Sequence, residues 1–228
     1  MLLFTSSITP YEVFFILLSH VLFVLFAFLF AFPAQAVPLD SLFVKAPREV
    51  LPLLGVTERL DLLDLYGHGM SAKAENSLGG QSELLEKTEN RLKLKTSEAG
   101  TWEMRLFRLE ADSLILVIHS VKAIGVQSEV SAYRTNWTPA FVQLPSPSLG
   151  RLIDMASSSI SPLRKQELLS VLREQPIRVE FTGEKQNLLT YAIDLSGVSL
   201  NDREDAAGVT RSATYELLPN GSFVRREP

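Results

Sequence analysis

His68 is the first candidate for chemistry, because carboxylates precede it at helical spacing. Asp61 and Asp64 lie three residues apart on a predicted helix, hence on one face, and His68 follows that helix. An imidazole with two carboxylates could bind a metal ion or form an acid–base pair. The same residues also suit a solvated helix end, where the helix dipole favours a partly charged imidazole. We adopt the second interpretation and assign neither a catalytic nor a metal-binding residue.

His119 lies in the apolar run ILVIHSV, and serine catalysis is the chemistry to consider there. The alternation predicts that His119 faces the core with Ile115 and Val117, where one hydrogen bond would satisfy its ring. A serine nucleophile would need a turn such as G-x-S-x-G, which the sequence lacks. Ser161, followed by Pro162, is better explained as the N-cap of a helix.

A cationic patch is the best candidate for ligand binding. Arg91, Lys93 and Lys95 alternate along one predicted strand, and Arg105 lies on the next strand with Glu103 nearby. Four cations on one sheet face could bind an anionic ligand. Such a face is more often a solvated surface with cross-strand ion pairs, so both interpretations stay open.

Composition excludes several classes of function. The chain contains no cysteine, which rules out disulfides, thiol catalysis and thiolate metal sites. Its 22 basic and 26 acidic residues give a net charge of −4, so nothing in the charge favours nucleic acid as a partner. No motif indicates a cofactor.

The elements that must position these residues follow from hydrophobic periodicity. The spacing of Leu60, Leu63 and Tyr66 predicts a helix that starts near Thr57 and ends at Gly67. Residues 71–90 are expected to form a loop with a short helical turn at 82–87. A second helix is expected to start at Ser161 and stop before Pro176, and a polar loop is expected over 201–211.

Alternation of polar and apolar residues predicts the strands. The expected strands are 91–96, 102–106, 113–121, 126–133, 177–181, 188–195, and a final hairpin of 213–218 and 222–226. The side chains expected in the core are Trp102, Met104, Leu106, Ile115, Val117, Phe181, Tyr191 and Ile193.

The fold class predicted is α+β, with antiparallel meander sheets packed with a few helices. Residues 37–228 are expected to form a single domain of ordinary size. Two sub-halves, 37–140 and 149–228, share a plan of helices followed by strands. One long meander interrupted by a helix explains the pattern equally well.

Residues 1–36 predict export. Val13 to Phe32 is an almost unbroken apolar run, and Pro33 is followed by Ala34-Gln35-Ala36, the pattern that a signal peptidase recognises. Residues 1–12 carry no Lys or Arg, and the run is long enough to cross a bilayer, so an uncleaved anchor is the alternative. We therefore expect the periplasm or the cell surface, and contact with a membrane only through this segment if it is uncleaved.

Two stretches carry a resemblance to a known family. The sequences PLDSLFVKAPREVLPLLGVTERLDLLDLYGHGM and SELLEKTENRLKLKTSEAGTWEMRLF resemble an uncharacterised secreted family of Bacteroidales that carries only a domain-of-unknown-function label. The resemblance implies an exported α+β protein and transfers no activity. It also implies candidate O-glycosylation at Ser41 and Ser113, each in an Asp–Ser–aliphatic pattern used in this bacterial group.

These observations predict an exported binding or interaction module whose partner is an unknown protein or glycan. Two alternatives stay open. One is a hydrolase that works with carboxylates alone, and the other is a membrane-anchored accessory protein.

Cleavage after Ala36 is the first testable outcome. N-terminal sequencing of the exported protein is expected to begin at Val37, because Pro33 ends the apolar helix just before the small-residue pattern. Recovery of the intact chain from the membrane fraction would contradict this prediction and favour the anchor.

Overall fold

The computed structural model describes residue 11 and residues 37–110, 112–156, 160–183 and 187–227. Residues 37–228 form one compact unit. The predicted leader falls almost wholly outside the described residues. Within them, no helix has both the length and the apolar character needed to cross a bilayer.

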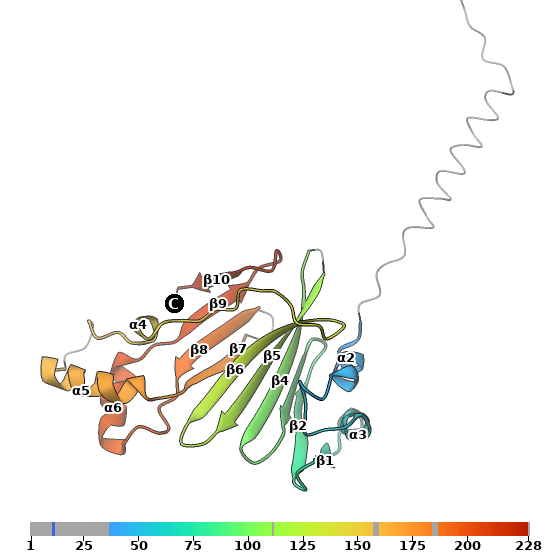
Figure 1. Ribbon diagram of the computed structural model, residues 1–228, viewed down its shortest axis with the longest axis horizontal. Coiled ribbons are helices and arrows are strands. Elements are labelled where there is room, and N and C mark those ends of the chain that lie inside the picture. Colours follow the sequence, from blue (N-terminus) through green and yellow to red (C-terminus); the bar gives the residue numbers. More distant parts are fainter. Residues whose placement is uncertain (1–10, 12–36, 111, 157–159, 184–186, 228) are drawn as a thin grey trace, which may run out of the picture. The chain divides into compact units, whose positions relative to one another are not determined.

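Two antiparallel sheets form the framework (Figure 1). The first is a six-stranded meander in the order β1-β2-β3-β4-β5-β6, and the second is four-stranded in the order β10-β9-β8-β7. The described helices are α2 (Leu39–Lys45), α3 (Val56–Gly67), α4 (Leu149–Leu152), α5 (Pro162–Arg173) and α6 (Leu200–Val209). The first sheet comprises β1 (Lys73–Glu75), β2 (Gln81–Lys87), β3 (Arg91–Lys95), β4 (Gly100–Arg108), β5 (Ser113–Lys122) and β6 (Val126–Arg134). The second comprises β7 (Ile177–Thr182), β8 (Leu188–Ile193), β9 (Ala213–Leu217) and β10 (Phe223–Arg226). The predicted α+β class with meander sheets is confirmed.

Strands β4 and β5 are buried on both faces. Met104 and Ile115 face a core that α2 and α3 complete, whereas Phe107 and Leu116 face a second core shared with β7, β8 and helices α4 to α6. An unbroken apolar strand such as β5 is what burial on both faces requires. All eight side chains predicted for the core are buried.

The segment 71–90 corrects the sequence prediction, because it forms β1 and β2 and not a loop with a helical turn. Ser82 and Leu84 are buried at alternate positions, but a β-bulge between Leu84 and Glu86 then shifts the register. Leu85, at the bulge, is half exposed, and Glu86 then pairs with Lys93 on the charged side of the sheet, so the alternation of polar and apolar residues is lost over the second half of the strand.

The predicted polar loop at 201–211 is also wrong, because it contains α6. The Ser199 hydroxyl accepts a hydrogen bond from Asp202 N and caps the helix. Only Ala206 and Val209 are buried along it, so the helix has almost no apolar stripe to detect. Arg164 of α5 holds it instead, through Asp202 at 2.6 Å and Asp205 at 2.9 Å.

Helix α3 forms where predicted, but its inward face differs. Arg59, Leu62, Leu63 and Tyr66 face the core or its margin, whereas Leu60 is half exposed. Arg59, and not Leu60, lies on the inward face of the helix. Its guanidinium donates hydrogen bonds to the carbonyls of Leu51 and Leu54 beneath the helix.

Substitution of Ile115 by Ala is expected to lower the free energy of unfolding by about 2–5 kcal/mol, because it leaves a cavity in the core under α2 and α3. Ile124→Ala is the matched control, since Ile124 is 83 % exposed in the β5–β6 turn and should change stability by less than about 0.5 kcal/mol. Denaturant titration measures both values. Equal losses at the two positions would mean that the buried faces of β5 are assigned wrongly.

Candidate functional site

The predicted cationic patch does lie on one sheet face, but carboxylates accompany its charges. Arg91 pairs in register with Arg105, and Lys93 pairs with Glu103. The buried Glu103 carboxylate lies 2.6 Å from Arg91 Nε and 3.4 Å from Lys93 Nζ. Lys95 Nζ donates to Glu98 at 2.8 Å. The arrangement resembles a network of cross-strand ion pairs more than a set of four free cations.

Arg105 is not on the surface. Only 1 % of it is exposed, and both terminal nitrogens of its guanidinium lie 3.3 Å from Gly183 O. The guanidinium also lies over the rings of Phe107 and Phe181, at 5.6 and 5.9 Å from their centroids. Desolvation lowers the pKa of Arg105 below its usual value, and neighbouring Arg91 adds to the effect. This side chain therefore joins the two sheets.

His68 and Asp64 come together at the end of α3, as their spacing predicts. His68 Nδ1 lies 2.8 Å from Asp64 O and 3.6 Å from Asp64 Oδ1, and both side chains are well exposed. Across the described ranges, no three His, Asp or Glu side chains are grouped so that they could bind a metal ion.

The prediction that His119 is buried is wrong. It shares a sheet face with Ile115 and Val117 but lies opposite Glu129 near the end of β5, where its side chain is exposed. The apolar cluster under α2 and α3 includes Ile115 and Val117 and stops short of His119. Ser161 caps α5 by accepting from Arg164 N. The glycosylation candidates Ser41, in α2, and Ser113, at the start of β5, are both partly buried.

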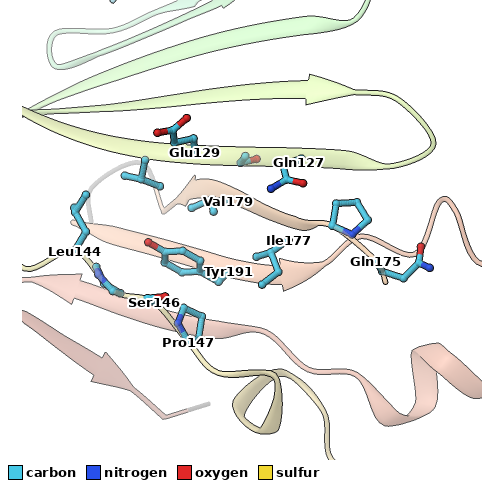
Figure 2. A pocket seen from close by; sticks show the side chains of 13 residues that line it. Gln127, Glu129, Leu144, Ser146, Pro147, Gln175, Ile177, Val179 and Tyr191 are labelled. Atoms are coloured by element: carbon cyan, nitrogen blue, oxygen red, sulfur yellow. The ribbon is translucent and has the colours of Figure 1, made fainter. Parts of the chain in front are cut away.

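A groove that sequence reasoning missed lies where the first sheet meets the second. We call it the β6 groove, a cavity of about 420 Å³ between β6, the connector before α4, and strands β7 and β8 (Figure 2). Its lining residues are Gln127, Ser128, Glu129, Val130, Leu144, Pro145, Ser146, Pro147, Gln175, Pro176, Ile177, Val179 and Tyr191.

The β5–β6 turn fixes the position of β6 at this groove. A Cβ atom at Gly125 would lie 2.8 Å from Pro176 Cγ and 3.0 Å from Asp194 Oδ1, so only glycine allows the turn to approach so closely. The Asp194 carboxylate accepts hydrogen bonds from Val126 N and from Ser196. Burial alone would raise the pKa of Asp194, but these hydrogen bonds outweigh it and hold the pKa below its usual value.

The groove has an apolar floor and a polar rim. Ile177, Val179 and Tyr191 belong to the core-facing side of the second sheet and form the floor. Gln127 and Glu129 are exposed on β6, and Figure 2 labels both beside that strand. Cavities of this size with a few polar groups are typical of ligand sites.

Tyr191 is the unusual residue of the groove. It is only 6 % exposed, and among the described residues its hydroxyl has no hydrogen-bond partner. Its ring packs edge-on against Tyr215, and Figure 2 shows the hydroxyl end on the side of Leu144. Burial raises the pKa of Tyr191, with a smaller contribution from Tyr215. An unpaired buried hydroxyl is costly to the fold.

Sequence signals for the groove were weak. Pro145 and Pro147 mark an extended connector but do not say which strand it passes. Tyr191 was correctly predicted to be buried, but a sequence cannot show that its hydroxyl lacks a partner. For Gln127 and Glu129, the sequence pattern indicates only that they lie on the solvent side of a strand.

The comparisons place the chain in a family. Residues 31–207 match the family model described as "Protein of unknown function (DUF3256)", and the chain belongs to that family. The chain is also similar to a solved structure, "Structure of a domain of an uncharacterized protein from Porphyromonas gingivalis W83", with 22 % identity and a TM-score of 0.68. That match covers 83 % of this chain and 98 % of the other, and at this identity it shows the fold alone. No curated protein matches the chain.

Replacing Tyr191 by Phe is expected to leave stability unchanged or to raise it by up to about 1–3 kcal/mol, because the substitution removes an unpaired buried hydroxyl. Tyr66→Phe is the matched control. The Tyr66 hydroxyl accepts from Lys87 N at 3.2 Å, so its loss should cost about 1 kcal/mol.

Alkaline pH should separate the same variants. The pKa of Tyr191 is higher in the folded chain than in the unfolded chain, so this residue makes no pH-dependent difference to stability below the unfolded pKa of about 10 and lowers stability progressively as the pH rises above it toward the folded pKa. Unfolding titrations at pH 8 and pH 11 should show a smaller loss for Tyr191→Phe than for the unsubstituted protein. Equal losses would mean that the hydroxyl is hydrated or paired.

Proposed function

We propose that this protein is an exported, non-enzymatic binding module that takes its ligand in the β6 groove. The observation that carries the proposal is the unpaired, buried hydroxyl of Tyr191 in a groove with an apolar floor and polar rim. The apolar run before Pro33 and the pattern Ala34-Gln35-Ala36 support a site of action in the periplasm or at the cell surface.

The lining of the groove favours binding over hydrolysis. Carboxylate-based hydrolysis uses two acidic groups on either side of the reacting bond. Among the described residues that line the groove, Glu129 is the only carboxylate. The amides of Gln127 and Gln175 and the hydroxyls of Ser128 and Ser146 are suited to hydrogen bonding with a ligand.

The β6 groove supports the proposal better than the cationic patch does. In the patch, Glu103 compensates Arg91 and Lys93, and Arg105 is enclosed between the two sheets. An anionic ligand there would compete with ion pairs that already exist. The groove offers polar groups on its rim without such a network.

Site-specific photo-cross-linking in intact producing cells tests this function. A photoreactive amino acid replaces Gln127, an exposed residue on the groove rim. The matched control replaces Arg178, an exposed residue of β7 that does not line the groove. Mass spectrometry of the recovered protein then detects added mass from either a protein or a glycan.

The expected result is a defined adduct at position 127 that is absent at position 178, on protein recovered from the exported fraction. Adducts of equal yield at both positions, or at neither, would contradict the proposed function. Adducts found only on protein inside the cytoplasm would contradict its exported site of action.

A further inference from the structure

We infer that the β6 groove takes an extended peptide, which adds as a strand to the open edge of β6 and places a Lys or Arg beside Glu129. This inference rests on the proposed binding function and names the class of its ligand. Strand addition of this kind uses main-chain hydrogen bonds for affinity and side-chain pockets for selectivity.

Backbone direction along β6 shows which peptide groups face the edge. Val126 N donates to the Asp194 carboxylate, and Ala132 O accepts from Ala140 N at 2.9 Å. Neither partner belongs to β5, so the peptide groups of these residues point away from that strand. β6 pairs with β5 from Val126 to Arg134 without a register shift, and backbone groups alternate in direction along a strand. The peptide groups of Ser128 and Val130 therefore also point outward.

The open part of the edge coincides with the groove. The far end of β6 is covered, because Arg134 N donates to Thr138 O and Ala132 O accepts from Ala140 N. Between this cover and Asp194, the outward peptide groups of Ser128 and Val130 form no backbone hydrogen bond with any other described segment. Strands β6 and β7 are not hydrogen-bonded neighbours, and Ser128 and Val130 both line the groove.

The position of this edge distinguishes it from an ordinary exposed strand. Proteins usually protect edges by keeping them short or charged. The edge strand β1 has three residues, and β10 ends in Arg225-Arg226. β6 has nine residues and carries Glu129, so it is neither short nor uncharged, but its edge lies in the groove lined by β7 and by residues 144–147. The cavity of about 420 Å³ along this edge is the space that an extended chain would occupy.

Side chains around the edge define what the peptide should carry. Alternate residues of an added strand point to opposite faces. One set would contact the floor at Val130, Ile177 and Val179, which suits aliphatic or β-branched residues. The other set would lie beside Gln127 and Glu129. Among the described residues Glu129 forms no ion pair, so its charge is available for a Lys or Arg of the peptide.

Selection and chemical modification of peptides test the inference. The full-length expressed protein is used to select binders from a phage library of short random peptides, and the preferred sequences are synthesised. Each peptide is compared with a version that is N-methylated at alternate residues, which removes the N–H groups of one edge. Calorimetric titration measures both. Loss of two main-chain hydrogen bonds should weaken binding about tenfold or more.

Two substitutions in β6 provide the protein side of the test. Ser128→Pro removes the outward N–H, and proline is tolerated at a sheet edge. Ser128→Ala is its matched control, because both variants lose the hydrogen bond between Ser128 Oγ and Ser120 Oγ. Peptide affinity should fall for Ser128→Pro and persist for Ser128→Ala. If Ser128→Pro does not fold, the comparison of N-methylated with unmethylated peptides on the unsubstituted protein tests the main-chain hydrogen bonds by itself.

Charge exchange tests the role of Glu129. Glu129→Lys should reject a peptide with Lys or Arg at the facing position and accept the same peptide with Glu there. Glu180→Lys on the exposed side of β7 is the control and should change neither affinity. Peptide binding that survives N-methylation, or that ignores the charge at 129, would overturn the inference. So would a library that yields no binder. A groove that binds a glycan, shown by the position-dependent adduct at 127, would leave the binding function standing and remove only the peptide.

Discussion

Burial of β4 and β5 on both faces is the constraint on which the rest of the structure depends. One face of this strand pair needs α2 and α3 as a cover, and the other needs the second sheet. Without cysteines, the chain has no covalent links to hold these layers together, so packing must do so. Polar groups inside the layers must then be satisfied locally. Glu103 meets this requirement with Arg91 and Lys93, and Arg105 meets it with Gly183 O and two aromatic rings.

Arg59 shows how the cover of helices is secured. Its guanidinium donates to Leu51 O at 3.0 Å, to Leu54 O at 2.7 Å, and to Ala46 O at the C-terminal end of α2. One buried cation thereby satisfies carbonyls from three successive pieces of chain, and it lies where the dipole of α2 favours positive charge. Desolvation lowers the pKa of Arg59, but the carbonyls replace much of the lost water. Trp102 of β4 adds another hydrogen bond to the segment between α2 and α3, because its Nε1 donates to Val50 O.

Sequence patterns predicted the parts of the fold in which one local rule acts alone. The alternation in β4 and the apolar run of β5 place Trp102, Met104 and Ile115 in the core correctly. The rule failed where a second effect intervened. A bulge at Leu84 hid β2, and a cap with ion pairs formed α6 without an apolar stripe. His119 follows the correct period but lies beyond the cover provided by the helices, which no pattern within β5 can show.

The candidate site could not be predicted because it arises from how the chain returns along β6. After Arg134 the connector turns back at Trp137, which adopts a positive φ of 64° and whose Nε1 donates to Leu42 O. Residues 138–140 then cover the far end of the β6 edge, and Asp194 covers the near end. Pro176 lies against the turn at Gly125. The middle of the β6 edge remains open, because residues 138–140 and Asp194 cover only its two ends. The sequence of residues 127–130 resembles that of an ordinary solvent-facing strand. Only the tertiary structure shows that these residues line a groove.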